Sequence, residues 1–344
     1  MSRFCRHSRF IERCPICRDT VPGLAPASKG STVAAGSRRS SSKGTAADRR
    51  RARAGARNLR VYRDGAPRGE DDGYRCDLVP GLRNSHDALR LAQEVAFSSG
   101  RLELLGSSPP GLYAEVRAQG SWERATWICF LIAYLSPLQG DAPFLGIRQA
   151  LRGCGGGEVP DWQAPGELPD LTDVPLGPRT SHDPARGVDT LRAYLQWAQR
   201  SGSQVRAFSG DPTWSEERRF ERLFERLQLP GLGRMGRYEL LVTVGRLGLY
   251  EVRADALHYA GGLNQATGDL ATLSAKRMFG IGDPLILERR ALALAEALSV
   301  PMEALDLAFA NWARPPAEER ATLGMPADTC DEQALESACA ALEV

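Results

Sequence analysis

The sequence predicts an all-α fold, and three observations support this. Apolar residues recur every three or four positions through most of the 344-residue chain, as they do along one face of a helix. Capping residues stand before several of these runs. No stretch alternates apolar and polar residues as a half-buried strand would. The elements should therefore be helices joined by loops.

Composition indicates the solubility and the cellular compartment of such a chain. A hydrophobic content of 42% and a charged content of 25% fit a soluble globular domain. No apolar run approaches the ~20 residues of a membrane span, and no apolar signal core begins the chain. Eight cysteines in 344 residues are too sparse for a disulfide framework. We expect a reduced, cytoplasmic protein.

The chain is organised around a predicted helix, tight turn and second helix between residues 271 and 298. Residues 271–278 contain good helix formers and no breaker. Gly280 and Gly282 permit a tight turn, Asp283 is a natural N-cap, and Pro284 suits the first helical position. Apolar spacing then predicts the buried stripe of the second helix: Leu285, Leu287, Ala291, Leu292, Ala295 and Leu298.

This turn is a candidate phosphate site. A glycine turn that opens a helix leaves backbone N–H groups directed outward, which favours an anion. The predicted donors are the backbone of Gly280, Ile281 and Gly282. Four cations flank the turn and would assist: Lys276, Arg277, Arg289 and Arg290. The alternative for Arg289 and Arg290 is that they simply face solvent.

Further apolar periods predict the other helices: residues 86–105, 122–135, 144–151, 188–200, 214–227, 237–249, a core helix ending near 312, and 331–342. The stretch 122–135 is apolar almost all round and should be central. Alternating charges within 214–227 indicate a solvated, salt-bridged face. Two glycines, Gly245 and Gly248, would allow close packing of their helix. Residues 153–186, rich in Gly, Pro and Asp, predict a long loop.

The first eighteen residues form a separate unit. Cys5 and His7 are followed by Cys14 and Cys17, and such thiolate and imidazole pairs suit tetrahedral Zn²⁺. So small a knuckle has almost no core, and the metal would supply its folding energy. The alternative is a plain turn with reduced thiols.

Residues 21–72 contain few large apolar side chains and predict disorder. Between Lys29 and Arg63 stand eleven basic residues and one acidic residue, a local charge of +10, although the whole chain carries only +2. A basic segment of this kind suits a polyanion and predicts weak tethering to nucleic acid. The alternative is a solubilising linker.

Several motifs together resemble a known enzyme family. Helix, Phe-Gly-Ile-Gly turn, helix, and then Asp306 at the start of a further helix are similar to the helix-hairpin-helix DNA glycosylase superfamily. More narrowly, the chain resembles the alpha-glutamyl/putrescinyl thymine pyrophosphorylases of clade 3. The motifs that carry this resemblance are the N-terminal Cys/His set and residues 125–138, 237–241, 275–283 and 305–312.

These observations together predict four segments, of which the resemblance covers the first and the third. Residues 1–20 would be the zinc knuckle, 21–73 a basic linker, 74–314 the helical catalytic domain, and 315–344 a helical extension. Two departures from the glycosylase pattern matter. Pro284 stands where strand-cleaving glycosylases carry a nucleophilic Lys, which disfavours lyase chemistry. Only Cys330 and Cys339 remain where other glycosylases bind an iron–sulfur cluster, so no cluster is expected.

The family's implied substrate is DNA in which a thymine methyl group carries a diphosphate ester, and an amino acid or polyamine amine displaces that diphosphate. Asp306 would accept the amine proton or stabilise its charge, and the cations around the hairpin would bind phosphate. The alternative for Asp306 is a helix N-cap. Asn311 and Trp312 are candidates either for core packing or for stacking on the base. Two other functions stay open: a monofunctional DNA glycosylase and a non-catalytic DNA-binding adaptor.

The N-terminal motif yields a direct prediction. Protein purified without chelator should contain one Zn²⁺ per chain, held by Cys5, His7, Cys14 and Cys17, and replacing Cys14 and Cys17 together by Ser should remove it, because two ligands cannot hold the metal. Elemental analysis measures this, with Cys330→Ser and Cys339→Ser as controls that keep the zinc. Metal-free wild-type protein would contradict the assignment.

Overall fold

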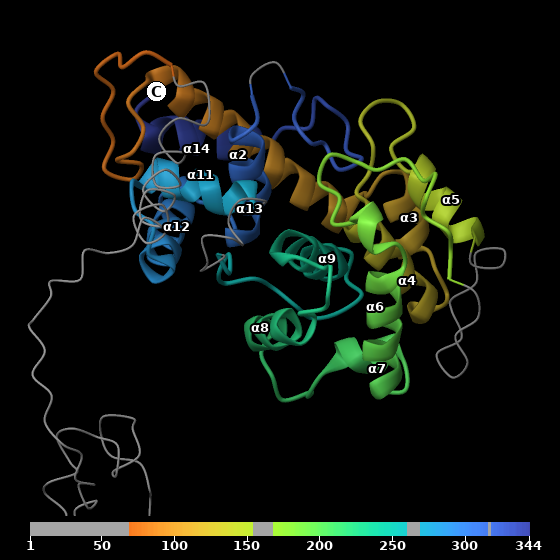
Figure 1. The fold of residues 1–344 in the computed structure, drawn as a ribbon. Helices are drawn as coiled ribbons and strands as arrows, with labels where there is room; N and C mark the ends of the chain where they lie inside the picture. The colour runs from red at the N-terminus through yellow and green to blue at the C-terminus, as the bar shows by residue number, and fades with distance from the viewer. Residues whose placement is uncertain (1–68, 154–167, 260–268, 316–317) are drawn as a thin grey trace, which may run out of the picture. The chain divides into compact units, whose positions relative to one another are not determined.

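The computed structural model describes residues 69–153, 168–259, 269–315 and 318–344. Across these ranges the regular elements are helices, with no strand, and the all-α prediction is confirmed (Figure 1). Within the same ranges, no helix has the length and apolar character needed to cross a membrane. The predicted zinc knuckle and most of the basic segment, residues 1–68, lie outside the described residues.

Twelve α-helices and one short 3₁₀ helix are described. In chain order they are α2 (Ser85–Ser107), α3 (Gly111–Arg117), α4 (Trp122–Leu135), α5 (Leu145–Gly153), η3 (Pro184–Arg186), α6 (Asp189–Arg200), α7 (Gln204–Ser209), α8 (Glu216–Arg226), α9 (Arg234–Arg246), α11 (Leu270–Phe279), α12 (Pro284–Leu298), α13 (Met302–Trp312) and α14 (Glu332–Leu342). The sequence predicted all of the α-helices but α3 and α7, and it placed η3 in the predicted loop 153–186. Helices α3 and α7 have only six or seven residues, too few to display a helical period.

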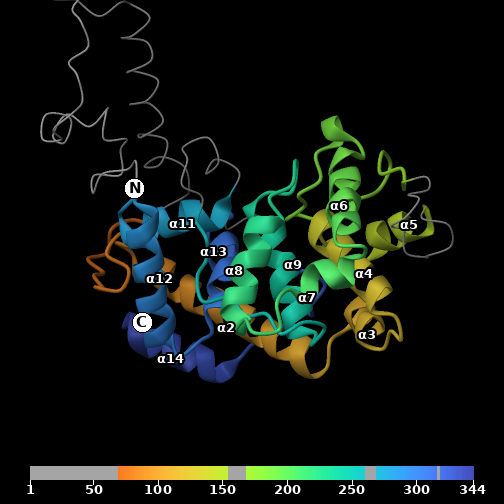
Figure 2. The same cartoon turned by 90° about the horizontal axis from the view of Figure 1, so that it is seen from below.

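Two groups of helices meet at α9. Helix α4, which is buried from Ala125 to Leu135, packs against α3, α5, α7 and α9, so its predicted central place is confirmed. Helix α13 packs against α2, α11 and α12, while α14 covers α2 and α12. Figures 1 and 2 both place α8 and α9 between these two groups. Helix α2 joins them, because it contacts α9, α13 and α14.

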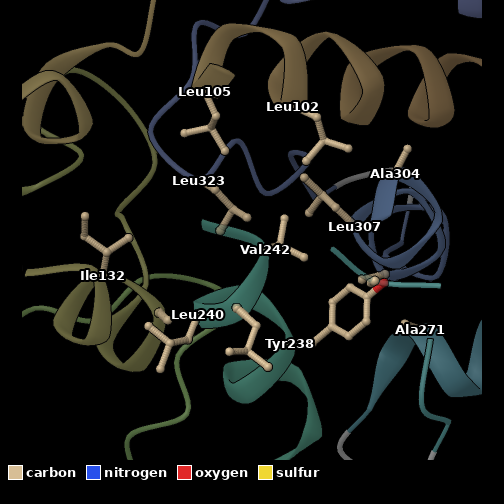
Figure 3. Close-up of a cluster of buried hydrophobic side chains, with 14 of the residues drawn as sticks. Leu102, Leu105, Ile132, Tyr238, Leu240, Val242, Ala271, Ala304, Leu307 and Leu323 are labelled. Carbon is tan, nitrogen blue, oxygen red and sulfur yellow. The ribbon is translucent and has the colours of Figure 1, made fainter. Parts of the chain in front are cut away.

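The apolar core is continuous across this junction. Figure 3 shows side chains of α9 between those of α2, α4, α11 and α13. The labelled ones on these helices are Leu102, Leu105, Ile132, Tyr238, Leu240, Val242, Ala271, Ala304 and Leu307, and the labelled Leu323 comes from the segment between α13 and α14. Gly245 near the end of α9 lies against the Val252 backbone, where an added Cβ would stand 2.3 Å from the carbonyl oxygen. The close approach that the sequence suggested therefore involves a neighbouring loop rather than a helix.

The central helix, turn and helix are present as predicted. Helix α11 ends at Phe279, and its C-cap Gly280 has a left-handed φ of 66°. The Asp283 carboxylate caps α12 by accepting from the N–H groups of Leu285 (3.0 Å) and Ile286 (3.1 Å), and Pro284 opens the helix. From the other side, the Gly81 N–H donates to the Met278 carbonyl oxygen at 2.7 Å and covers the carboxyl end of α11.

The predicted buried stripe of α12 is wrong at two positions. The side chains of Leu285 and Leu292 are 72% and 46% exposed. The buried face consists instead of Leu287, Ala291, Leu294, Ala295 and Leu298. At about 100° per residue, Leu285 and Leu292 lie well away from the direction of Leu287, which faces the neighbouring helices.

The contact at Gly81 predicts a steric requirement. A Cβ at this position would lie 1.8 Å from the Arg277 carbonyl oxygen and 2.8 Å from that of Met278. Gly81→Ala should lower the free energy of unfolding by about 2 kcal/mol or more, because backbone must move to relieve the overlap. Denaturant unfolding measures this. Gly282→Ala is the control, since nothing lies within 4 Å of a Cβ there; equal losses for both variants would contradict the argument.

Candidate functional site

A cavity of about 860 Å³ lies at the amino end of α9. Its walls come from residues before α6, the carboxyl half of α8, the segment that connects α8 to α9, and residues close to α11. The lining residues are Thr180, Ser181, Arg186, Phe224, Glu225, Gln228, Leu229, Gly231, Leu232, Gly233, Arg234, Met235, Arg237, His258, Tyr259 and Asp269. This volume is within the range of about 300–1,000 Å³ typical of small-molecule sites. The cavity is therefore the candidate functional site.

Arg234, the first residue of α9, forms the inner wall of the cavity. Its guanidinium forms ion pairs with Asp269 and with Asp306, and its Nη1 donates to the Leu257 carbonyl oxygen at 2.7 Å. All three charged side chains are buried. Burial opposes the charge of Arg234, but the two carboxylates outweigh it and raise the pKa of Arg234 above its ordinary range. One guanidinium thus joins α9, α11 and α13.

Asp306 lies in this network and not at a helix start. Helix α13 begins at Met302 after Pro301, so the N-cap alternative is wrong. The Asp306 carboxylate is 2% exposed: one oxygen pairs with Arg234, and the other accepts from Arg179 Nη2 at 2.7 Å. Asp306 does not line the cavity. Because both of its oxygens accept from guanidinium groups, the observed geometry suits positioning of Arg234 better than direct proton transfer.

Asp269 completes a balanced set of two buried arginines and two buried carboxylates. Its oxygens accept from Arg234 and, at 2.6 Å, from the Thr272 hydroxyl. Burial raises the pKa of Asp269, but the Arg234 guanidinium outweighs burial and leaves the pKa below its ordinary value. Such a carboxylate stabilises the fold above its unfolded pKa of about 3.9 and loses that contribution as pH falls through its lower folded value. The junction should therefore weaken in acid.

Arg237 is the cavity cation whose charge is least compensated. Its guanidinium lies over the Phe224 ring, 4.2 Å from the centroid, and Nη1 donates to the Phe224 carbonyl oxygen at 2.9 Å. Within the described part of the chain, no carboxylate is in ion-pair distance of it. Burial and the nearby Arg234 charge lower the pKa of Arg237 to about 10. A cation in this state gains by binding an anion.

Aromatic and neutral polar groups also line the cavity. The His258 ring stacks on Phe224 with centroids 4.3 Å apart, and His258 has a left-handed φ of 52°. Burial lowers the pKa of His258 to about 4, so the imidazole is neutral at physiological pH. Burial also raises the pKa of the neighbouring Tyr259 well above its ordinary value, which keeps its hydroxyl protonated. Neither group carries charge at neutral pH.

The predicted hairpin residues lie apart from this cavity. None of the seven lines it: Lys276, Arg277, Gly280, Ile281, Gly282, Arg289 and Arg290. Two N–H groups at the start of α12, those of Leu285 and Ile286, already bind the Asp283 carboxylate and not a phosphate. Arg289 is exposed, and Arg290 donates to the Asp77 carbonyl oxygen at 3.1 Å. The hairpin and the cavity are two separate features.

The two candidates for stacking on a base have structural roles in this fold. The Asn311 side chain is buried and bonds the backbone of Ala321 through both its oxygen (3.0 Å) and its nitrogen (3.3 Å). Trp312 is also buried, and its indole N–H donates to the Asp87 carbonyl oxygen at 2.9 Å. Their core-packing alternative therefore fits the structure.

Comparison with known proteins gives one match. Residues 180–321 match the family model of alpha-glutamyl/putrescinyl thymine pyrophosphorylase clade 3. The match supports the resemblance that the sequence motifs indicated. Every residue that lines the cavity falls within the segment matched to this pyrophosphorylase family. No curated protein and no solved structure matches the chain.

Sequence reasoning missed most residues of the site. Arg179, Arg234, Asp269, His258 and Tyr259 belong to no spacing motif. Arg237 was present in the quoted 237–241 motif, but nothing in the motif distinguished a cavity cation from a helix-surface arginine. A charged residue directly after a glycine-rich turn, such as Arg234 after 231–233, is the one local signal that was available.

The buried network predicts the outcome of Asp306→Asn. An amide keeps the size of the side chain but leaves two buried guanidiniums with one carboxylate between them. The free energy of unfolding should fall by about 3 kcal/mol, as expected when one partner of a buried ion pair is removed. Denaturant unfolding measures it. Asp189→Asn is the matched control, because its pair with Arg192 is exposed and the unfolding midpoint should hardly move. An equally stable Asp306→Asn protein would show that the pairs contribute little.

Proposed function

We propose that this chain modifies thymine in DNA, by displacing diphosphate from a thymine-type base with an amine. The observation that supports this most is the position of Arg237: an incompletely compensated cation in a cavity that lies wholly within the segment matched to thymine pyrophosphorylases. A leaving diphosphate carries several negative charges and needs such a partner. Arg186, half-exposed at the rim, would be a second cation for it.

The proposed reaction is a substitution at the exocyclic carbon of the base. A bond forms between the amine nitrogen and that carbon, the bond from carbon to diphosphate oxygen breaks, and its electron pair leaves with the diphosphate. The amine then loses a proton to a proton acceptor of the protein. Because the amine and the leaving group must reach opposite sides of one carbon, the base has to leave the helical stack. A cavity of about 860 Å³ offers room for the extruded base and its diphosphate.

Roles follow from the contacts. Glu225 lines the cavity and is exposed, so it is the carboxylate best placed to accept the amine proton. Its present partner is Arg222, at 3.0 Å on the surface of α8. Asp306, buried between Arg179 and Arg234, would keep Arg234 in the inner wall. In this proposal Asp306 supports the reaction without touching the substrate.

DNA would be held outside the cavity. The proposal assigns its phosphates to the hairpin backbone at 280–282 and to Lys276, Arg277, Arg289 and Arg290, with the basic N-terminal segment adding nonspecific attraction. A structural zinc site would be formed by Cys5, His7, Cys14 and Cys17. The amine donor would be an amino acid or a polyamine, as the family description suggests.

Arg237→Gln tests the proposal. Full-length protein is incubated with an amine and DNA that contains a 5-diphosphate ester of hydroxymethyluracil, and the nucleosides are analysed by mass spectrometry. Wild-type protein should form the amine-substituted nucleoside, and Arg237→Gln should form it about 100-fold more slowly, because one cation on the leaving group is lost. Arg192→Gln, which removes an exposed arginine of α6, should retain full activity.

Two results would contradict the proposal. Release of a free base by the wild-type protein would favour the glycosylase alternative, in which the bond to the sugar breaks instead. Unchanged nucleosides, despite retention of the modified DNA by the protein, would favour the adaptor alternative.

A further inference from the structure

Two polar groups in the cavity wall lack partners. The hydroxyl of Tyr259 and the Nε2 atom of His258 are buried, yet neither has a hydrogen-bond partner among the described residues. Tyr259 is only 7% exposed. A buried polar atom that makes no hydrogen bond destabilises a fold, and native proteins retain few of them without a reason. Both belong to side chains that line the same cavity.

The backbone of these two residues, by contrast, is firmly held. Glu288 of α12 accepts from the N–H groups of Leu257 at 2.8 Å and Tyr259 at 2.9 Å, one with each carboxylate oxygen. Arg234 binds the carbonyl oxygen of Leu257. These bonds flank His258 and support its left-handed φ, which a residue other than glycine seldom adopts. The wall is thus rigid in its backbone and incomplete in its side-chain hydrogen bonds.

The chemistry of the two groups is specific. The Tyr259 hydroxyl can donate, and a neutral His258 that carries its proton on Nδ1 can accept at Nε2. A thymine-type base presents an N–H between two carbonyl oxygens, which complements one acceptor beside one donor. With His258 opposite the ring N–H and Tyr259 opposite the O4 carbonyl, a cytosine-type base in the same register would place its unprotonated ring nitrogen against His258 and its amino group against Tyr259. The bond to His258 would be lost, and Tyr259 could no longer donate. Stacking of His258 on Phe224 keeps the imidazole plane fixed.

We propose that His258 and Tyr259 read the imide edge of the base, selecting thymine-type over cytosine-type bases, and that Glu288 is the residue that positions them. This rests on the proposed function, because it assumes that a base enters the cavity. Glu288 belongs to the helix that follows the hairpin turn, so the same helix would face DNA at one end and fix the reading groups through its second turn.

The chain provides matched controls. Tyr238 also has a buried hydroxyl without a partner among the described residues, but it does not line the cavity. Tyr259→Phe and Tyr238→Phe therefore remove the same kind of group, inside and outside the cavity wall. Glu296 lies on α12 as Glu288 does but is exposed, which makes Glu296→Gln the control for Glu288→Gln.

The experiment measures the dissociation constants of full-length protein for single-stranded oligonucleotides that carry 5-hydroxymethyluracil, 5-hydroxymethylcytosine or an abasic site. Wild-type protein should prefer the uracil-type base over both others. Tyr259→Phe and Glu288→Gln should each reduce the preference over the cytosine-type base about tenfold, because a hydrogen bond that discriminates the two is lost or misplaced. The two control variants should keep the wild-type ratio. Partial unfolding would weaken the binding of all three oligonucleotides alike and would not change the ratio of their dissociation constants.

Hydrogen exchange supplies a second readout for Glu288. In Glu288→Gln the amides of Leu257 and Tyr259 should exchange faster than in the Glu296→Gln control, since one strong acceptor is weakened. If wild-type protein prefers the base over the abasic site but Tyr259→Phe keeps the full preference for uracil over cytosine, the inference fails and the proposed function stands. If wild-type protein binds all three oligonucleotides equally, base capture fails and the proposed function falls with it.

Discussion

The Arg234 guanidinium is the contact on which this structure depends most. It begins α9, pairs with a carboxylate at the start of α11 and another inside α13, and holds the backbone of residue 257. A buried guanidinium is tolerated only when its charge and its donors are satisfied. The three helices must therefore be in place together before the inner wall of the cavity exists. The shape of the cavity therefore depends on the packing of the core.

Charge in and around the cavity is divided by position. The deep network of Arg179, Arg234, Asp269 and Asp306 is balanced in charge, so it contributes shape rather than reactivity, although Nε and Nη1 of Arg179 have no hydrogen-bond partner among the described residues. Nearer the opening, Arg237 lies over the ring of Phe224, and no carboxylate among the described residues forms an ion pair with it. The wall formed by residues 258 and 259 is polar but neutral. A ligand with a charged end and an uncharged planar end matches this division.

Rules for capping, helical periodicity and turns correctly predicted the features that depend on neighbouring residues in the sequence. The caps at Asp283 and Pro284, the ends of α4 and the turn at Gly280 depend on neighbours within a few residues, and the sequence predicted each of them. The site depends on contacts between distant residues: Asp306 meets Arg179 across 127 positions and Arg234 across 72. No spacing rule reaches so far. The exposed Leu285 and Leu292 show the same limit, because apolar character indicates a buried face only when a neighbouring helix lies on that side.

The bridging place of α9 has a consequence for how the matched segment can be handled. Residues 180–321 contain the cavity, but α9 is packed against α4 and α2, and α13 lies along α2, both from the preceding part of the chain. A fragment cut at residue 180 would lose Arg179 and expose the apolar sides of α9 and α13 to water. The family segment is thus a portion of a fold and not an autonomous module. Recombination or truncation at its edges would separate the cavity from the helices α2 and α4 that support its walls.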